Sequence, residues 1–288
     1  MKAGERAEMP LPRTVAVVGL GLMGGSLCRA LKALDSPPRV IGWDLRQAAG
    51  AMALEAGAID RFEVGGPEGL AAAGLVVYAT PLRATLSLIP RHAGMVREDA
   101  VLTDVVSLNE PVLRAAQAAG LSGRFVSAHP ICGGESSGFA AGRADLYRGA
   151  TVWLSAGGEG GGDAHRCVES LWRTLGGSPR WVAPGEHDRR MGWVSHLPQL
   201  VANALAAALD AQGCSRDELG PGGRDMTRLA GSNPAIWRDL LEASAPVTGA
   251  GLTGVANALN VLADLLARRE LDRVADFMER TRRWTAGE

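Results

Sequence analysis

Two side chains in the first half of the chain combine proton-transfer chemistry with a suitable setting. His129 follows the apolar run 125–128 and precedes Pro130. A neutral imidazole titrates near physiological pH, so it can accept a proton from a hydroxyl group. Ser107, which follows another apolar run, can hydrogen-bond the same hydroxyl. Each has a plainer interpretation: His129 as a strand-end histidine bonded to the backbone, and Ser107 as a helix N-cap.

Further polar residues with possible chemistry lie in the second half of the chain. His196, Gln199 and Asn203 share one face of a predicted helix, opposite an apolar stripe. That face is either plain solvent surface or a polar surface that closes over a ligand. Arg224 and Arg228 are four residues apart, so two guanidinium groups can hold one carboxylate. The alternative is a solvated, charged helix face.

A glycine pattern near the N-terminus is typical of dinucleotide binding. Gly19-Leu20-Gly21-Leu22-Met23-Gly24 lies between the apolar run 14–18 and a helical stretch, and Asp44 follows about 20 residues later. The glycines permit a tight turn, close approach of the backbone to a pyrophosphate, and close packing of helix on strand. The helix N-terminus presents free N–H groups to the phosphates. The alternative is a glycine-rich turn without a ligand.

Asp44 also indicates which dinucleotide is bound. A carboxylate there accepts hydrogen bonds from ribose hydroxyls and repels a 2′-phosphate, so we predict NAD rather than NADP. Arg46, two residues on, softens that preference. The residues predicted to bind the cofactor are Gly19, Gly21, Leu22, Met23, Gly24, Asp44, Thr80, Pro81 and Asp104.

The elements that must position these residues alternate between strands and helices in the first part of the chain. We predict strands at 14–18, 40–43, 75–79, 101–104, 125–128, 151–154 and 181–182, and helices at 27–34, 47–56, 108–119 and 164–175. This order predicts an α/β fold with a Rossmann-type, doubly wound parallel sheet. Ligands bind outside the carboxyl ends of such strands, which brings Ser107 and His129 toward the nicotinamide end of a bound dinucleotide.

No strong strand signal appears after residue 185. An apolar stripe of Val194, Leu197, Val201, Leu205 and Ala208 has helical spacing, and further helices are expected at 224–229, 234–243, 252–268 and 271–284. Ser232-Asn233-Pro234 is typical of a cap with proline at the first helical position. We therefore predict a lead-in without order at 1–12, a dinucleotide-binding domain at 13–184, and an all-α domain at 185–288 that packs against a second subunit.

Composition narrows the class of protein. The 288-residue chain has a net charge of −1, which gives no electrostatic basis for binding nucleic acid or an anionic membrane. No apolar run in the sequence approaches transmembrane length. The four cysteines are scattered, which argues against a zinc site or a disulfide framework and indicates a reduced, cytoplasmic protein. We expect His92, His165 and His187 to be surface residues.

Several motifs together resemble the prephenate/arogenate dehydrogenases of tyrosine biosynthesis, the TyrA family. Besides the glycine turn, they are Thr103-Asp104-Val105-Val106-Ser107-Leu108, His129-Pro130-Ile131-Cys132-Gly133-Gly134-Glu135-Ser136-Ser137-Gly138 with its extension 141–147, Ser195-His196-Leu197-Pro198-Gln199-Leu200, and Arg224-Asp225-Met226-Thr227-Arg228-Leu229-Ala230. The glycine turn is common to many dehydrogenases, whereas the other four in this order are far more specific. The resemblance extends from Val15 to about Leu241.

The resemblance implies an activity and a role for each candidate residue. The expected reaction is the NAD-dependent oxidative decarboxylation of prephenate to 4-hydroxyphenylpyruvate, or of arogenate to tyrosine. His129 and Ser107 would be catalytic at the ring hydroxyl. Substrate-binding residues would be His196, Arg228, Arg224 and Gln199, with Arg228 on a substrate carboxylate. The resemblance further implies a homodimer through the helical domain and no metal.

The chain departs from the family at two positions. The family often has a second histidine where Gln199 stands and a bulky aromatic where Gly223 stands, so prephenate and arogenate both remain open. A hydroxyacid dehydrogenase of the same two-domain type would need a catalytic lysine on the helical domain, but the only lysines are Lys2 and Lys32. A dinucleotide-binding sensor without catalysis would need none of Ser107, His129, His196 or Arg228.

Overall fold

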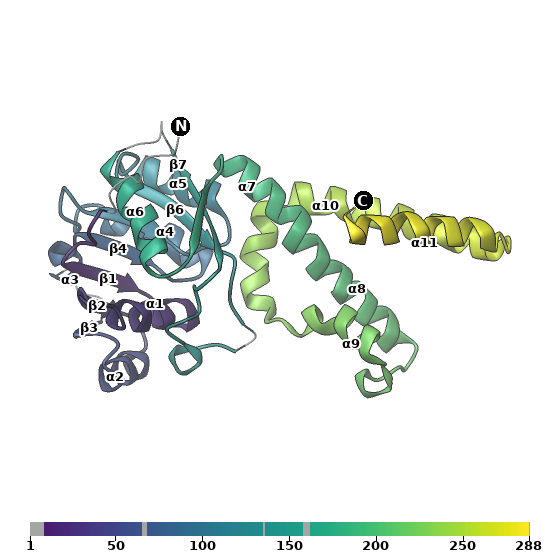
Figure 1. Cartoon of the computed structure of the whole chain (residues 1–288), viewed down its shortest axis with the longest axis horizontal. Helices are drawn as coiled ribbons and strands as arrows, with labels where there is room; N and C mark the ends of the chain where they lie inside the picture. Colours follow the sequence, from purple (N-terminus) through teal and green to yellow (C-terminus); the bar gives the residue numbers. More distant parts are fainter. Residues whose placement is uncertain (1–8, 65–67, 135, 158–161, 288) are drawn as a thin grey trace. The chain divides into compact units, whose positions relative to one another are not determined.

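The computed structural model describes residues 9–64, 68–134, 136–157 and 162–287 (Figure 1). Most of the predicted lead-in, 1–12, lies outside these residues. The chain forms two compact units, and each is described by itself. The first contains the residues up to Met191 together with Ser232–Ala243, and the second contains Gly192–Gly231 and Ser244–Glu288.

The first unit is built on an eight-stranded sheet with the order β3-β2-β1-β4-β5-β6-β7-β8. The strands are β1 (Thr14–Val18), β2 (Arg39–Trp43), β3 (Arg61–Glu63), β4 (Leu75–Tyr78), β5 (Val101–Asp104), β6 (Phe125–Pro130), β7 (Thr151–Ala156) and β8 (Ser178–Trp181). All neighbouring pairs are parallel except β6 and β7, which are antiparallel. The predicted Rossmann-type sheet is confirmed, with one reversed strand that the alternation of elements did not indicate.

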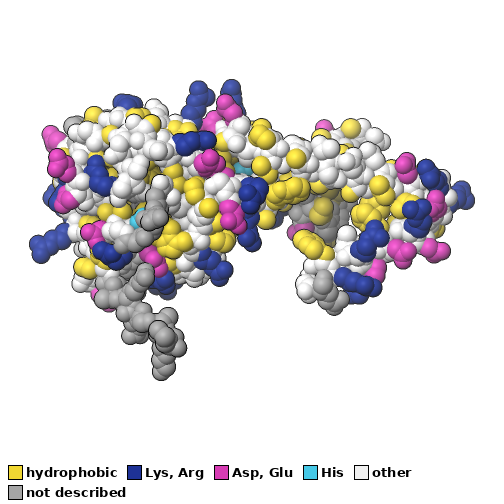
Figure 2. Space-filling view, turned by 90° about the horizontal axis from the view of Figure 1, so that it is seen from above, with side chains coloured by type: hydrophobic (Ala, Val, Ile, Leu, Met, Phe, Trp, Pro, Cys, Tyr) yellow, Lys and Arg dark blue, Asp and Glu magenta, His cyan; other side chains and the backbone are white. Residues whose placement is uncertain are grey.

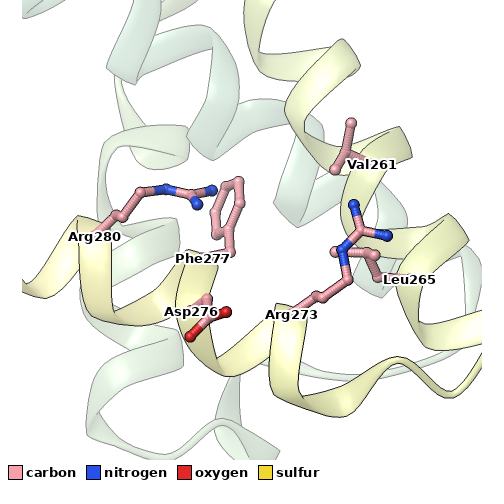
Figure 3. Close-up of a pocket in the computed structure, with 6 residues that line it drawn as sticks. All are labelled: Val261, Leu265, Arg273, Asp276, Phe277 and Arg280. Atoms are coloured by element: carbon pink, nitrogen blue, oxygen red, sulfur yellow. The ribbon is translucent and has the colours of Figure 1, made fainter.

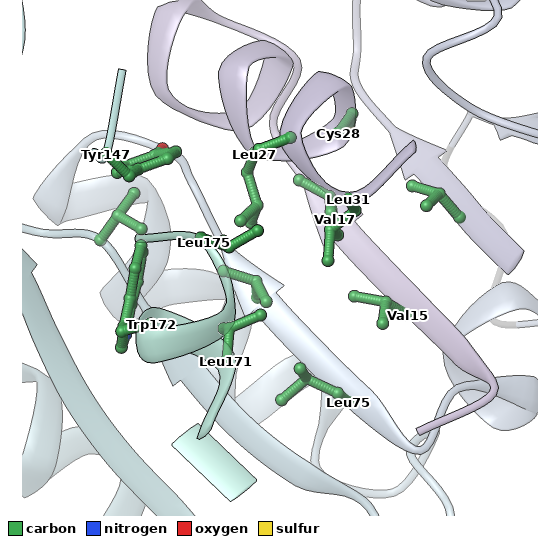
Figure 4. Packing of buried hydrophobic residues seen from close by; sticks show 14 of the residues in the cluster. Val15, Val17, Leu27, Cys28, Leu31, Leu75, Tyr147, Leu171, Trp172 and Leu175 are labelled. Atoms are coloured by element: carbon green, nitrogen blue, oxygen red, sulfur yellow. The ribbon is translucent and has the colours of Figure 1, made fainter. Parts of the chain in front are cut away.

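Helices cover both faces of this sheet, as the continuous burial of Val15–Val18 in β1 requires. Val15 and Val17 face one apolar cluster and Ala16 and Val18 face another. The first cluster includes α1 (Leu22–Lys32), α2 (Gln47–Glu55) and α6 (Asp163–Thr174), and Figure 4 shows its side chains packed between α1, the sheet and α6. The second cluster includes α3 (Glu68–Ala72), α4 (Leu82–His92), α5 (Asn109–Ala118) and Leu240 of α10. α7 (Pro184–Met191) ends the first continuous segment of the unit.

The second unit is entirely helical in its described residues. It contains a π-helical turn (Gly192–His196), α8 (Leu197–Ala211), a 3-10 turn (Arg216–Glu218), α9 (Pro221–Thr227), a 3-10 turn (Arg228–Gly231) and α11 (Leu271–Ala286). α10 (Pro234–Ala267) begins in the first unit and continues into the second. The helices expected at 234–243 and 252–268 are therefore one helix, which runs through Pro246. Asn233 caps it as predicted, because its Oδ1 accepts the Ala235 N–H at 3.0 Å.

α10 corrects the expectation that nothing in the chain approaches transmembrane length. By length and composition alone it is a helix that could cross a membrane, and only 11% of its most apolar window is buried. Figure 2 shows hydrophobic side chains on the surface of the helical part of the molecule. The exposed apolar side chains of α10 and α11 include Leu259, Val261, Leu266, Leu271, Met278 and Trp284.

Candidate active site

The glycine turn has the geometry that a bound pyrophosphate requires. Gly19 has φ +100°, and a Cβ there would lie 2.5 Å from the carbonyl oxygen of Ala79. A Cβ at Gly24 would lie 1.8 Å from the carbonyl oxygen of Gly19, so only glycine lets α1 pack this closely. A Cβ at Gly21 would meet no atom within 4 Å, which leaves open the side from which a ligand can approach the backbone.

The N-terminus of α1 is also suited to binding an anion. Gly21 is the N-cap and makes no side-chain capping bond, and the first turn contains no acidic residue. The first N–H groups of the helix therefore point outward without a competing carboxylate. The segment 141–147 fixes this end of the helix, because the Tyr147 hydroxyl donates to the Met23 carbonyl at 2.7 Å and the Arg143 N–H donates to Ser26 Oγ at 3.0 Å.

Asp44 stands at the end of β2 and already accepts several hydrogen bonds. Leu20 N–H donates to Oδ2 and Arg46 N–H to Oδ1, both at 2.8 Å. The Arg46 guanidinium also donates to both oxygens, at 3.2 and 3.3 Å. Burial alone would raise the pKa of Asp44, but these hydrogen bonds outweigh burial and lower it. The carboxylate is therefore ionised and fits the ribose-binding role, while its pairing with Arg46 bears on cofactor choice.

The remaining predicted cofactor residues lie at the carboxyl ends of β4 and β5. Thr80 Oγ1 lies 2.8 Å from Thr85 Oγ1, and Pro81 is the N-cap of α4. Asp104 is fully buried, and its Oδ1 accepts the Val106 N–H at 2.9 Å. Burial raises the pKa of this carboxyl group to about 8. Contact of these residues with a cofactor stays a prediction.

Ser107 and His129 lie at neighbouring strand ends, as expected from the sheet order. Ser107 is half-buried in the connection between β5 and α5, and His129 is half-buried in β6. The N-cap interpretation of Ser107 is wrong, because Leu108 occupies that position without a side-chain capping bond. The first N–H groups of α5 instead donate to the carboxylate of Asp188, from Asn109 at 2.8 Å and from Glu110 at 2.9 Å.

The structure adds a residue that the sequence analysis placed on the surface. His187 is only 1% exposed, and its Nε2 lies 3.1 Å from Nδ1 of His129. The two rings are nearly perpendicular, with an interplanar angle of 86°. The other nitrogen of His187, Nδ1, lies 2.7 Å from Oδ1 of Asp188. The sequence signal was only a His-Asp pair shortly after the last strand, and no spacing rule connects it with His129.

The surface expectation is also wrong for His92, which is 5% exposed. Its ring stacks on Tyr78 with centroids 5.8 Å apart, and its Nδ1 lies 3.4 Å from the Tyr78 hydroxyl. Burial lowers the pKa of His92 to about 4, so this histidine is neutral near pH 7. His165 is half-buried and stacks on Trp181, with centroids 4.7 Å apart. These two histidines belong to the packing of the first unit.

In the second unit, the solvent-surface interpretation fails for two of the three polar residues on α8 and its preceding turn. His196 is 1% exposed, and its Nδ1 lies 2.8 Å from Ser244 Oγ. Gln199 is also buried and donates to Asn203 Oδ1 at 2.8 Å and to the Leu229 carbonyl at 2.7 Å. Asn203 itself is exposed. The Gln199–Leu229 bond ties α8 to the 3-10 turn that begins with Arg228.

The two candidate arginines, Arg224 and Arg228, are exposed and lie in consecutive elements of the second unit. Arg224 belongs to α9 and donates to the Asp217 carbonyl at 3.1 Å. Arg228 follows the end of α9 and begins the 3-10 turn. A small hollow elsewhere in this unit, between α10 and α11, has a volume of about 120 Å³ and is lined by Val261, Leu265, Arg273, Asp276, Phe277 and Arg280 (Figure 3). It is smaller than the roughly 300 Å³ of ordinary small-molecule sites.

Comparison with protein families accounts for both parts of the chain. Residues 27–179 match the prephenate dehydrogenase nucleotide-binding domain, and residues 183–280 match the prephenate dehydrogenase dimerization domain. The chain belongs to the prephenate dehydrogenase family. Family membership and the geometry of the glycine turn agree, because both assign nucleotide binding to the first part of the chain.

Individual relatives are consistent with this membership. A prephenate dehydrogenase of Bacillus subtilis is 33% identical over 239 residues, which cover 79% of this chain and 63% of that protein. The chain thus spans less than two thirds of that relative's length. A cyclohexadienyl dehydrogenase of Zymomonas mobilis is 27% identical and is matched over 83% of each chain. The structure of prephenate dehydrogenase from A. aeolicus in complex with hydroxyphenyl propionate and NAD+ is similar, with a TM-score of 0.86, 26% identity, and coverage of 96% of this chain and 98% of that one.

Proposed function

We propose that this protein catalyses the NAD-dependent oxidative decarboxylation of prephenate to 4-hydroxyphenylpyruvate in tyrosine biosynthesis. The observation that carries the proposal is the pairing of a complete dinucleotide-binding turn with a half-buried histidine at the end of β6, in a chain of the prephenate dehydrogenase family. The relative solved with NAD+ and hydroxyphenyl propionate supports both the cofactor and an aromatic product-like ligand.

The proposed cofactor-binding residues contact different parts of the dinucleotide. Gly19, Gly21 and Gly24 admit the pyrophosphate to the backbone, and the free N–H groups at the start of α1 stabilise its charge. Asp44 accepts hydrogen bonds from the adenosine ribose. Leu22, Met23, Thr80, Pro81 and Asp104 complete the proposed set. Bound NAD supplies the hydride acceptor.

The substrate-binding residues orient the ring and handle its proton. Nε2 of His129 accepts the proton of the ring hydroxyl while a hydride leaves the ring carbon that carries this hydroxyl. Ser107 hydrogen-bonds the hydroxyl oxygen. Arg228 binds a substrate carboxylate, with Arg224 as a second basic group, and His196 and Gln199 line the site. The ring ketone then loses its carboxylate as carbon dioxide, and the electron pair of the broken C–C bond makes the ring aromatic. The protein's main task is therefore alignment.

Arogenate is the second candidate substrate, giving tyrosine directly. The similarity to a cyclohexadienyl dehydrogenase supports it. Gln199 and Gly223 stand where the family often has histidine and a bulky aromatic, which leaves the choice of substrate open. The two substrates differ only in whether the side chain carries a keto or an amino group. Gln199 and Gly223 are candidates for the residues that distinguish these two groups.

We propose further that the protein acts as a cytoplasmic homodimer, with residues 13–184 as the cofactor domain and 185–288 as the substrate and dimerisation domain. The family models support a boundary between residues 179 and 183. The exposed apolar side chains of α10 and α11, including Leu259 and Met278, suit burial against a second subunit better than exposure to water.

The test is steady-state kinetics with prephenate and arogenate, each with NAD and NADP, in which formation of NADH or NADPH is followed at 340 nm. The proposal expects the highest kcat/KM with prephenate and NAD. A higher kcat/KM with arogenate would select the alternative, and absence of NADH with either substrate would refute both.

A further inference from the structure

Two residues near His129, the buried His187 and the half-buried Asp188, have no role in the function proposed above. His187 and Asp188 belong to α7 and connect His129 with the start of α5 through short contacts. We propose that Asp188 and His187 are positioning residues, which hold His129 in the one tautomer whose Nε2 can take the substrate proton. This rests on the proposed function, because His129 meets a substrate hydroxyl only in that reaction.

Asp188 determines which atoms donate and which accept in the hydrogen bonds that link it through His187 to His129. Its two oxygens accept the N–H groups of Asn109 and Glu110, which are the first residues of α5 and have no partner within the helix. The positive end of the helix dipole favours a negative charge here. An ionised carboxylate can only accept hydrogen bonds, so Nδ1 of His187 must carry a proton and donate it to Oδ1 at 2.7 Å.

A second carboxyl group nearby does not compete for this role. Burial, with a smaller contribution from the nearby carboxylate of Asp188, raises the pKa of Asp104 to about 8. Asp104 is therefore mostly protonated near pH 7, and it is Asp188 whose two oxygens accept the N–H groups at the start of α5.

The protonation of His187 at Nδ1 in turn determines which nitrogen of His129 carries a proton. A neutral imidazole has one N–H, and His187 uses it toward Asp188, so its Nε2 presents a lone pair. Nδ1 of His129, 3.1 Å away, must be the donor to that lone pair. The lone pair of His129 is then on Nε2. Because His187 is 1% exposed, water does not offer it alternative partners.

This arrangement matters at the moment of proton transfer. The hydroxyl proton of the substrate goes to Nε2 of His129, while the proton on Nδ1 stays and its hydrogen bond to His187 strengthens as the ring becomes positive. The carboxylate of Asp188, separated from His129 by the one ring of His187, stabilises that cation without being protonated itself. In the opposite tautomer Nε2 already carries a proton, so it cannot accept another. The same logic applies to the orienting carboxylate of a catalytic triad.

A purely structural role makes a different prediction. If Asp188 served only to cap α5, its loss would lower the stability of the protein and leave the tautomer of His129 unchanged. The two roles are separated by observing the tautomer directly. Nitrogen-15 NMR of histidine side chains distinguishes protonated from unprotonated ring nitrogens, and the five histidines of this chain make assignment practicable with single His→Gln variants.

The experiment uses the full-length protein without substrate, labelled with nitrogen-15 at histidine, near neutral pH. In the wild type we expect His129 to be protonated at Nδ1 and His187 also at Nδ1. In His187→Phe, which keeps the ring volume but offers no acceptor, His129 should shift toward protonation at Nε2. The matched control is His165→Phe, because His165 lies on α6 and stacks on Trp181. In that variant His129 should keep its wild-type signals. A wild-type His129 protonated at Nε2, or one unaffected by His187→Phe, would overturn the inference.

Kinetics with prephenate and NAD provide the second measurement. His187→Phe should lower kcat about 100-fold, with each KM within about 3-fold of wild type, since general-base catalysis is worth 10²–10⁴-fold. His187→Gly should recover part of this loss with added imidazole and none with pyrazole, which has similar size but little basicity. A loss confined to KM, or equal recovery with both additives, would overturn the inference. Because the NMR result does not depend on turnover, an inactive wild type would refute the proposed function while leaving the tautomer test intact.

Discussion

The buried carboxyl group of Asp104 should make the stability of this protein fall as the pH rises. Burial raises its pKa from an ordinary 3.8 to about 8. Between these values the folded chain holds a proton that the unfolded chain has released, so the free energy of unfolding decreases with pH. Each pH unit in that window is worth about 1.4 kcal/mol, so the full effect is on the order of 5 kcal/mol.

The substitution Asp104→Asn removes this dependence. The amide cannot ionise, and its oxygen can still accept the Val106 N–H that Asp104 Oδ1 accepts at 2.9 Å. We expect the variant to be close to wild type in stability near pH 4 and several kcal/mol more stable near pH 8. Urea unfolding at a series of pH values, followed by circular dichroism, measures the difference.

Asp60→Asn is a useful control because the ionisation of Asp60 should make the free energy of unfolding rise with pH, whereas that of Asp104 should make it fall. Burial would raise the pKa of Asp60, but hydrogen bonds from Lys32 and the Val40 N–H outweigh burial and lower it. Asp60 therefore stabilises the fold above the ordinary carboxyl pKa, and this contribution is lost as the pH falls. If Asp104→Asn and wild type gave parallel curves from pH 4 to 8, Asp104 would be ionised throughout and the reasoning about its burial would be refuted.

Three further predictions concern the cofactor and the substrate. Gly24→Ala should weaken NAD binding more than 10-fold and lower the melting temperature, because its Cβ would overlap the Gly19 carbonyl; calorimetry measures both, and wild-type affinity would contradict it. Arg46→Ala should raise the ratio of kcat/KM for NAD over NADP, since it removes the cation beside Asp44; an unchanged ratio would show that Arg46 has no part in cofactor choice. His129→Asn should lower kcat by 10²–10⁴-fold with little change in KM, whereas Arg228→Ala should mainly raise KM for prephenate, and the reverse pattern would exchange their roles.

The parts of the fold that could be predicted are those in which local patterns determine the structure. β1 and the glycine turn follow from a β-branched run and three glycines with fixed steric tasks. The sequence also predicts the helix after the turn, but at 27–34, because Gly24 and Gly25 are poor helix formers. α1 begins at Leu22 and includes both glycines. The reversed direction of β7 was not predictable in this way, because direction depends on the connection between β6 and β7, which carries one 3-10 turn (Phe139–Ala141) and no α-helix in its described residues. β3 and α3 are too short to show a clear periodic pattern, and α4 contains Pro90, a residue that usually ends a helix.

The candidate site was predictable only where its residues occur in motifs. Ser107 and His129 follow strands and were placed at the correct strand ends. His187 was missed because its partner lies 58 residues away and its burial results from tertiary packing. Likewise, Pro246 suggests a break in a helix, yet α10 continues through it. Proline fixes one backbone angle, but the packing of the surrounding helix decides whether the helix ends there.

The most direct test of the central claim is the stoichiometry of the reaction. Prephenate and NAD are incubated with the wild-type protein, and NADH and carbon dioxide are measured together during the initial rate. The account predicts one NADH for each carbon dioxide released, with both rates lowered equally in His129→Asn. NADH without carbon dioxide, or carbon dioxide released without NAD, would contradict it, as would equal rates in wild type and His129→Asn.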